Sequence, residues 1–126
     1  MRGGWRGRGS CERGQATVEL ALVLPLLVLC VAGIVWVGNV VTTQVRLEHA
    51  AREGARAAAV EPLSATSASQ AAVESSMGSG PSISTSVGAE YVVVEVTVRT
   101  PGLPLLGVGE RNLQATAHMR REDINN

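Results

Sequence analysis

An uninterrupted apolar run extends from Leu20 to Gly38, without a charged side chain and without a side-chain amide or hydroxyl. As an α-helix this run would be about 28 Å long, close to the hydrocarbon thickness of a bilayer. A chain of 126 residues could not surround so long an apolar helix with its own atoms. We therefore predict a membrane-spanning segment over about residues 20–41 rather than a buried core helix.

The helical pattern continues beyond the apolar run. Small and apolar residues recur there at spacings of three and four, namely Leu47, Ala50, Ala51, Gly54 and Ala58. Pro62 disfavours helical geometry at the residue before it, so the helix should end near Val60. Pro25 lies inside the run, where a proline in a membrane helix gives a kink rather than a break. The pattern predicts one long helix over residues 15–60.

The next segment, residues 61–81, is rich in serine and alanine. Ser64 could cap a short helix that extends to about Met77, and Gly78 could end it. The same composition also permits a loose linker. Both alternatives stay open at the level of sequence.

Beyond this segment the hydrophobic period changes to two, which is typical of a half-buried strand. Four valines alternate with polar residues there: Val92, Val94, Val96 and Val98. Weaker alternation on either side completes a small antiparallel sheet over residues 82–122, followed by a tail at 123–126. The predicted fold class is α+β: a long N-terminal helix, membrane-spanning in its first half, packed by a small antiparallel β-meander.

Composition and charge restrict the partners. The formal net charge is zero, so no global basic field favours nucleic acid. Lysine is absent, and four of the arginines lie in residues 1–14, which we interpret as a short basic leader. Arginine before the apolar run predicts a cytoplasmic N-terminus and an extracytoplasmic C-terminal domain in the cell membrane.

No residue pattern points to catalysis or to a cofactor. Cys11 lies before the apolar run and Cys30 inside it, so they offer neither a disulfide framework nor a metal site. His49 and His118 are far apart in sequence, and no phosphate-binding loop or nucleophile elbow is visible. We expect neither an enzyme nor a small-molecule binding protein.

The stretch around the start of the apolar run, "RGQATVELALVLP", places Glu19 five residues after Gly14 and six before Pro25. It resembles the class III signal of type IV pilins: a basic leader, a glycine at the cut, a glutamate and an apolar helix. With "AAREGARAAA" at residues 50–59, it is similar to TadE-like minor pilins of the tight adherence (Flp pilus) systems.

The resemblance implies a function and a set of partners. Prepilin peptidase would remove residues 1–14, leaving Gly14 as the last leader residue and Gln15 as the new N-terminus. Glu19 and Pro25 would then act in assembly with other pilin subunits and the pilus assembly platform, from a helix held in the lipid bilayer.

Physical chemistry gives Glu19 two interpretations. A carboxylate at a helix N-terminus is favoured by the helix dipole, by about 0.3–1 kcal/mol. Inside a bundle of helices an unpaired carboxylate is costly, whereas one paired with a neighbour's ammonium group is compensated. We favour the second interpretation, in which the charge fixes the register between subunits.

The stretch "AREGARAAA" also has two interpretations. Its charged residues predict a solvated helix face, with Glu48 and Arg52 spaced to form an ion pair. Its small residues, Ala50, Ala51, Gly54 and Ala58, predict close approach of the sheet or of another helix on the opposite face.

Two other functions compete with the pilin hypothesis. One is an uncleaved single-pass membrane protein with a small extracytoplasmic domain that binds a partner. The other is a secreted binding protein, which requires cleavage near the end of the apolar run, although the run exceeds the usual length of a secretory signal.

Overall fold

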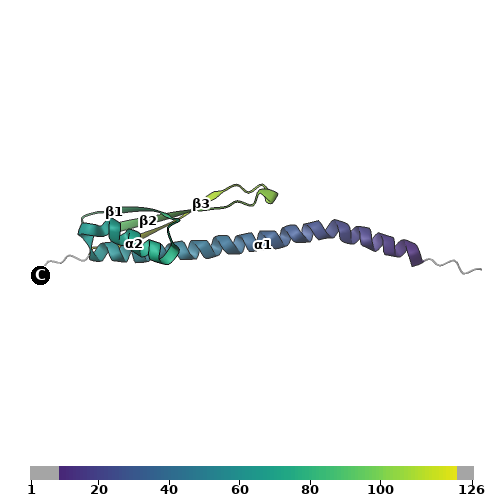
Figure 1. Cartoon of the computed structure of the whole chain (residues 1–126), viewed down its shortest axis with the longest axis horizontal. Helices are drawn as coiled ribbons and strands as arrows, with labels where there is room; N and C mark the ends of the chain where they lie inside the picture. The colour runs from purple at the N-terminus through teal and green to yellow at the C-terminus, as the bar shows by residue number, and fades with distance from the viewer. Residues whose placement is uncertain (1–8, 122–126) are drawn as a thin grey trace, which may run out of the picture. The chain divides into compact units, whose positions relative to one another are not determined.

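The computed structural model describes residues 9–121 (Figure 1). Its main elements in chain order are α1 (Gly9–Val60), α2 (Ala65–Met77), β1 (Ser82–Val87), β2 (Tyr91–Thr100) and β3 (Arg111–Arg120). Two short 3-10 turns, η1 (Pro62–Ser64) and η2 (Pro104–Leu106), lie in the connections. The predicted α+β class, a long helix followed by a small antiparallel sheet, is confirmed.

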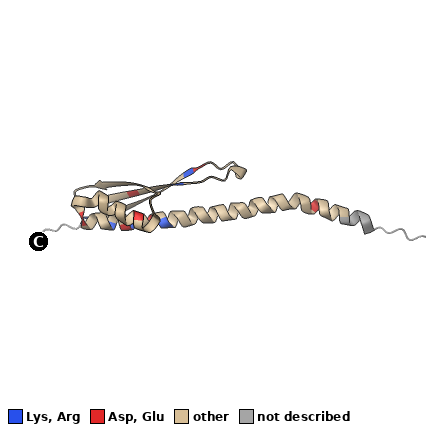
Figure 2. Cartoon of the chain, in the orientation of Figure 1, with Lys and Arg blue, Asp and Glu red and all other residues tan. Residues whose placement is uncertain are grey.

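The chain divides into two units, residues 1–36 and residues 37–126, and α1 contributes to both. In the first unit the large apolar side chains of α1 are uncovered; Leu22 is 74% exposed and Ile34 is 72% exposed. The core helix of a water-soluble protein would be mostly buried, whereas none of the most apolar window of α1 is. The helix is long and apolar enough to span a membrane. Figure 2 shows the uncharged stretch of α1 between Glu19 and Arg46.

The start of α1 differs from the prediction. The helix begins at Gly9, inside the segment interpreted as a leader, rather than at residue 15. No proline interrupts the chain between Gly9 and Pro25, and a single glycine costs a helix only about 1 kcal/mol, so Gly14 does not stop it. The helix also continues through Pro25. The rest of the predicted leader, residues 1–8, and the predicted tail, residues 123–126, lie outside the described residues.

The second unit contains the three-stranded sheet, in the order β1-β2-β3, with both pairs antiparallel. On β2 the alternating valines point to one face, where Val92, Val94 and Val96 are completely buried. α1 and α2 cover this face (Figure 1). The opposite face carries polar side chains, with Glu95 of β2 between Ser84 of β1 and Thr116 of β3.

The core joins both helices to the sheet. Leu47 is its largest fully buried side chain, and most of its other residues are alanine or valine. From α2 it takes Ala65 and Val73, together with the buried hydroxyl of Ser69, which lies 2.7 Å from the Thr85 hydroxyl on β1. This hydrogen bond satisfies a buried polar group and fixes α2 to the sheet.

Residues 65–77 form a helix rather than a linker, but Ser64 does not cap it as predicted. Its hydroxyl donates to the Glu61 carboxylate at 2.9 Å, and its backbone lies at φ −121° and ψ 26°. The carboxylate three residues earlier is the stronger acceptor, because hydrogen bonds to ionised groups exceed neutral ones. At the other end the Gly78 amide donates to the Glu74 carbonyl.

Leu47→Ala should lower the free energy of unfolding of the second unit by about 2–5 kcal/mol, because it leaves a cavity under the sheet. Leu63→Ala is the matched control, since Leu63 is fully exposed in η1; it should change stability by less than about 0.5 kcal/mol. Urea unfolding of the full chain in detergent, monitored by hydrogen exchange of the β2 amides, measures the free energy of unfolding of both variants. Equal effects of the two substitutions would contradict the described core.

Candidate processing and assembly site

The residues assigned to processing and assembly lie on one face of α1. Gly14, Gln15, Val18, Glu19 and Leu22 together line a shallow hollow on the helix surface. Their spacing of three to four residues accounts for this, because side chains one turn apart stack on the same face. A side chain built at Gly14 would meet nothing within 4 Å. The peptide bond after Gly14 is therefore uncrowded by other described parts of the chain.

The Glu19 carboxylate has no partner within the described part of the chain. Its side chain is exposed, and it makes neither a hydrogen bond nor an ion pair with any of the side chains described over residues 14–121. Gln15 lies four residues earlier, about 6 Å along the helix axis. An amino group created at Gln15 would thus stand one turn from the carboxylate, which remains available to a second chain.

Pro25 is exposed inside α1, one and a half turns after Glu19. Its missing amide leaves one helical carbonyl without its usual donor. Around it Leu24, Leu26 and Leu27 are each more than half exposed. The side chains beside Pro25 therefore need an apolar environment from outside the described chain.

The residues predicted for helix packing lie in the second unit, apart from this face. Ala50, Ala51 and Ala58 are buried, and a side chain built at Gly54 would lie 3.0 Å from the Val73 methyl of α2 and 3.3 Å from that of Val94. The small-residue face thus lets the helix backbone approach both α2 and the sheet closely.

The charged residues of the same stretch lie exposed. Glu48 and Arg52 do not form the predicted ion pair; among the side chains described over residues 14–121 the ion pair joins Arg120 to Glu90 at 3.0 Å. Two long side chains lose rotamer freedom when they pair in water, which offsets most of the Coulomb gain. This face is solvated, as the charge pattern indicated.

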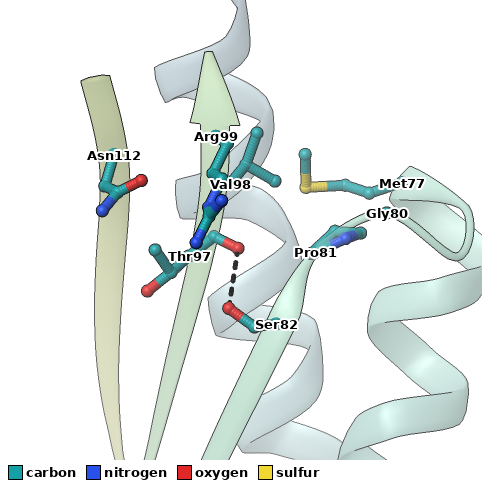
Figure 3. A pocket seen from close by; sticks show the side chains of 8 residues that line it. All are labelled: Met77, Gly80, Pro81, Ser82, Thr97, Val98, Arg99 and Asn112. Carbon is teal, nitrogen blue, oxygen red and sulfur yellow. Dashed lines mark hydrogen bonds between the residues drawn. The ribbon is translucent and has the colours of Figure 1, made fainter. Parts of the chain in front are cut away.

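A second hollow lies where α2 ends beside the sheet, lined by Met77, Pro81, Thr97, Arg99 and Asn112 among others (Figure 3). The Ser82 hydroxyl there donates to the Thr97 carbonyl at 3.3 Å, which closes one wall. Arg99 supplies its only ionisable side chain. In the described ranges no three His, Cys, Asp or Glu side chains gather in a way that could hold a metal ion.

Sequence reasoning missed two features of the second unit. Gln44 of α1 donates its side-chain amide to the Gln114 carbonyl of β3 at 3.2 Å, which fixes the level of the sheet along the helix. The loop after β2 presents two exposed leucines, Leu105 and Leu106. The run "LPLL" was a visible signal for the second feature, whereas no local signal marks the first.

The geometry defines a class of protein: an α+β chain whose long helix is uncovered and apolar at its start and built into a sheet-bearing unit at its end. Residues 14–56 match the family model described as TadE-like protein. The match begins at Gly14 and includes Glu19, Pro25 and Gly54, so the resemblance is confirmed over these residues. Comparisons with curated proteins and with solved structures gave no match.

Gly54→Val should destabilise the second unit by about 1–3 kcal/mol more than Gly38→Val, because only Gly54 faces Val73 and Val94. Gly38 has nothing within 4 Å and lies in the same helix, so the control carries the same change in helix propensity. Thermal unfolding in detergent measures the difference. Identical melting of the two variants would show that the helix does not approach α2 this closely.

Proposed function

We propose that this chain is a minor pilin or pseudopilin that is processed by prepilin peptidase and takes part in assembly of a Flp-type, tight adherence pilus. One observation carries the proposal: the stretch that matches the TadE-like model contains both the helix face with Gly14, Gln15 and Glu19 and most of the small-residue face built into the core, up to Gly54. The processing signal, the membrane segment and the foundation of the outer unit thus form one continuous helix.

The uncovered apolar side chains support insertion into the cell membrane. With Leu20 to Gly38 in the bilayer, arginines of the leader stay on the cytoplasmic side and the sheet lies outside. Burial of each leucine or valine side chain contributes about 1.5–3 kcal/mol, so the run far outweighs the cost of a single carboxylate at its end. This places Glu19 at the cytoplasmic boundary.

Cleavage after Gly14 would give Glu19 a role that it lacks in the precursor. The cut creates an α-amino group at Gln15, which titrates near pH 8 and is largely protonated at neutral pH. When helices leave the lipid and pack together, the carboxylate of one subunit can pair with the ammonium group of another. Only a stagger that joins the two groups avoids burying an unpaired charge, so the pair selects the register.

The same considerations favour a structural rather than a catalytic role. Four charged side chains of α1, those of Glu48, Arg52, Glu53 and Arg56, are exposed, and the hollow beside α2 holds a single ionisable group, Arg99. The residues with a specific arrangement are those of the apolar run, of the proposed cleavage position and of the small-residue face. We therefore assign the chain no catalytic activity and no cofactor, and its partners are the bilayer, the peptidase, other pilin subunits and the assembly platform.

Processing should yield a mature chain that begins at Gln15 when the gene is expressed together with prepilin peptidase. Gly14→Val should keep the leader, because the added side chain would obstruct the approach of the peptidase to the backbone at the cut. Gly38→Val, in the apolar run, should be processed normally. Intact-mass measurement of membrane fractions shows whether the natural chain and the two variants retain the leader. An intact leader in piliated cells would contradict the processing step.

Glu19→Ala should still insert into the membrane but should enter fibres at least about tenfold less, which corresponds to about 1.4 kcal/mol per subunit. Glu19→Gln keeps the size and should fail equally if charge is the cause. Glu53→Ala, an exposed carboxylate on the same helix, serves as the control and should assemble normally. Immunoblots of sheared fibres and of membranes measure both quantities; unchanged incorporation of the alanine variant would remove the assembly role.

A further inference from the structure

The loop between β2 and β3 ends in an apolar tip. Leu105 is 67% exposed and Leu106 is 49% exposed, and both follow Leu103 and Pro104. Both leucines lie in η2. Large apolar side chains at the tip of a hairpin contribute nothing to the core of their own unit and need a partner outside it.

This tip is ordered by its own backbone. The amides of Leu106 and Val108 both donate to the Leu103 carbonyl, and the Gly107 amide donates to the Pro104 carbonyl, at 3.0–3.2 Å. Gly102 packs so closely on the Val108 carbonyl that any side chain there would collide with it. A loop whose amides are already bonded can enter a poorly hydrated layer at lower cost than an open one.

Two contacts show the direction in which the hairpin runs. Gly54 of α1 faces Val94, and Gln44 of α1 reaches Gln114, which pairs with Thr97. Moving forward along β2 from Val94 to Thr97 therefore means moving backward along α1, from Gly54 to Gln44. Within the second unit β2 runs opposite to α1, and its end points toward residue 37.

The same contacts give the level of the tip. From Gln114 the hairpin extends three more residues toward the loop, to Arg111, which is about 10 Å. Along α1 the distance from Gln44 back to Asn39, the first polar residue after the apolar run, is about 7–8 Å. The last pair of the hairpin, Thr100 with Arg111, thus reaches the level at which the apolar run ends.

The charges near the tip suit a lipid surface. Arg99 and Arg111 are exposed where the hairpin enters the loop, and Arg46 is exposed on α1 close to the level of Gln44. Two carboxylates are exposed at the same levels, Glu110 in the loop and Glu48 one turn after Gln44, so cations exceed carboxylates by three to two. Arginines beside apolar side chains can contact lipid phosphates while the apolar side chains enter the layer below.

We propose that the tip of the β2–β3 loop, Leu103 to Leu106, inserts into the headgroup layer of the bilayer on the side of the sheet. This rests on the proposed insertion of α1 into a membrane. The sheet unit is then attached at two points, through the helix that emerges from the lipid and through the loop. Its orientation toward the membrane is fixed before it joins a fibre.

The test uses the full chain in vesicles of phosphatidylcholine and phosphatidylglycerol that contain nitroxide-bearing lipids. An environment-sensitive fluorophore is attached at one cysteine per variant. Cys11→Ser keeps the natural Cys30, an exposed thiol of the apolar run, as the marker for helix insertion. In a chain that also carries Cys30→Ser, Leu105→Cys labels the tip, and Leu63→Cys labels an equally apolar, fully exposed position in η1.

We expect blue-shifted emission and strong quenching by the lipid at positions 30 and 105, and neither effect at position 63. Quenching at 30 without quenching at 105 would overturn the loop contact and leave membrane insertion intact. A blue shift at 105 that grows with protein density and ignores the lipid quencher would assign the tip to a neighbouring chain and would overturn the proposal. Equal quenching at 63 and 105 would also overturn it, and an unquenched Cys30 would defeat membrane insertion itself.

Discussion

A helix that displays leucine and valine on all sides cannot remain in water, and the rest of the molecule follows from this constraint. Between Leu20 and Gly38 the chain has no charged side chain and no side-chain amide or hydroxyl, and among the described residues none of the most apolar window of α1 is buried. Lipid can cover this surface, and so can the same surface of other helices. A chain that exchanges one environment for the other can move from a membrane into a fibre without changing its fold.

The role proposed for Glu19 depends on the same constraint. In lipid the carboxylate would lie at the boundary, ten residues after the start of α1 at Gly9. Only a cut after Gly14 would bring it near a helix N-terminus, where the helix dipole favours a carboxylate. Between packed helices it must be paired, and α1 supplies no partner for it among the described residues. Under the proposed assembly the pairing group would come from another chain, and the absence of lysine leaves the α-amino group at Gln15 as the primary amine of a processed chain. The chemistry of the cut and the chemistry of assembly would then be linked by one pair of charges.

The sequence predicted those parts of the fold that depend on local patterns. Alternating valines predicted β2, and small residues at helical spacing predicted the face that approaches Val73 and Val94. Ser64 stands at the N-cap position of α2, as the pattern allowed, but makes no side-chain cap bond, because the nearby Glu61 carboxylate competes for its hydroxyl. The predicted Glu48–Arg52 pair failed for a similar reason, since solvent competes for both charges.

The level of the hairpin could not be predicted, because it depends on contacts between residues far apart in sequence. The run "LPLL" indicates only a loop. The contact between Gln44 and Gln114 shows how far the strands extend along the helix. The candidate site shows the same limit: Gly14, Gln15 and Glu19 were predicted from a resemblance to pilins, and the partner proposed for Glu19 would lie in another chain.

Carbodiimide treatment of assembled fibres, followed by peptide mass mapping, tests the central claim most directly, because it joins a carboxylate only to an amine in contact with it. The account predicts an amide bond between the Glu19 side chain of one chain and the α-amino group at Gln15 of a neighbouring chain. A free amino group at Gln15 in fibres, with Glu19 unlinked to it, would contradict the account.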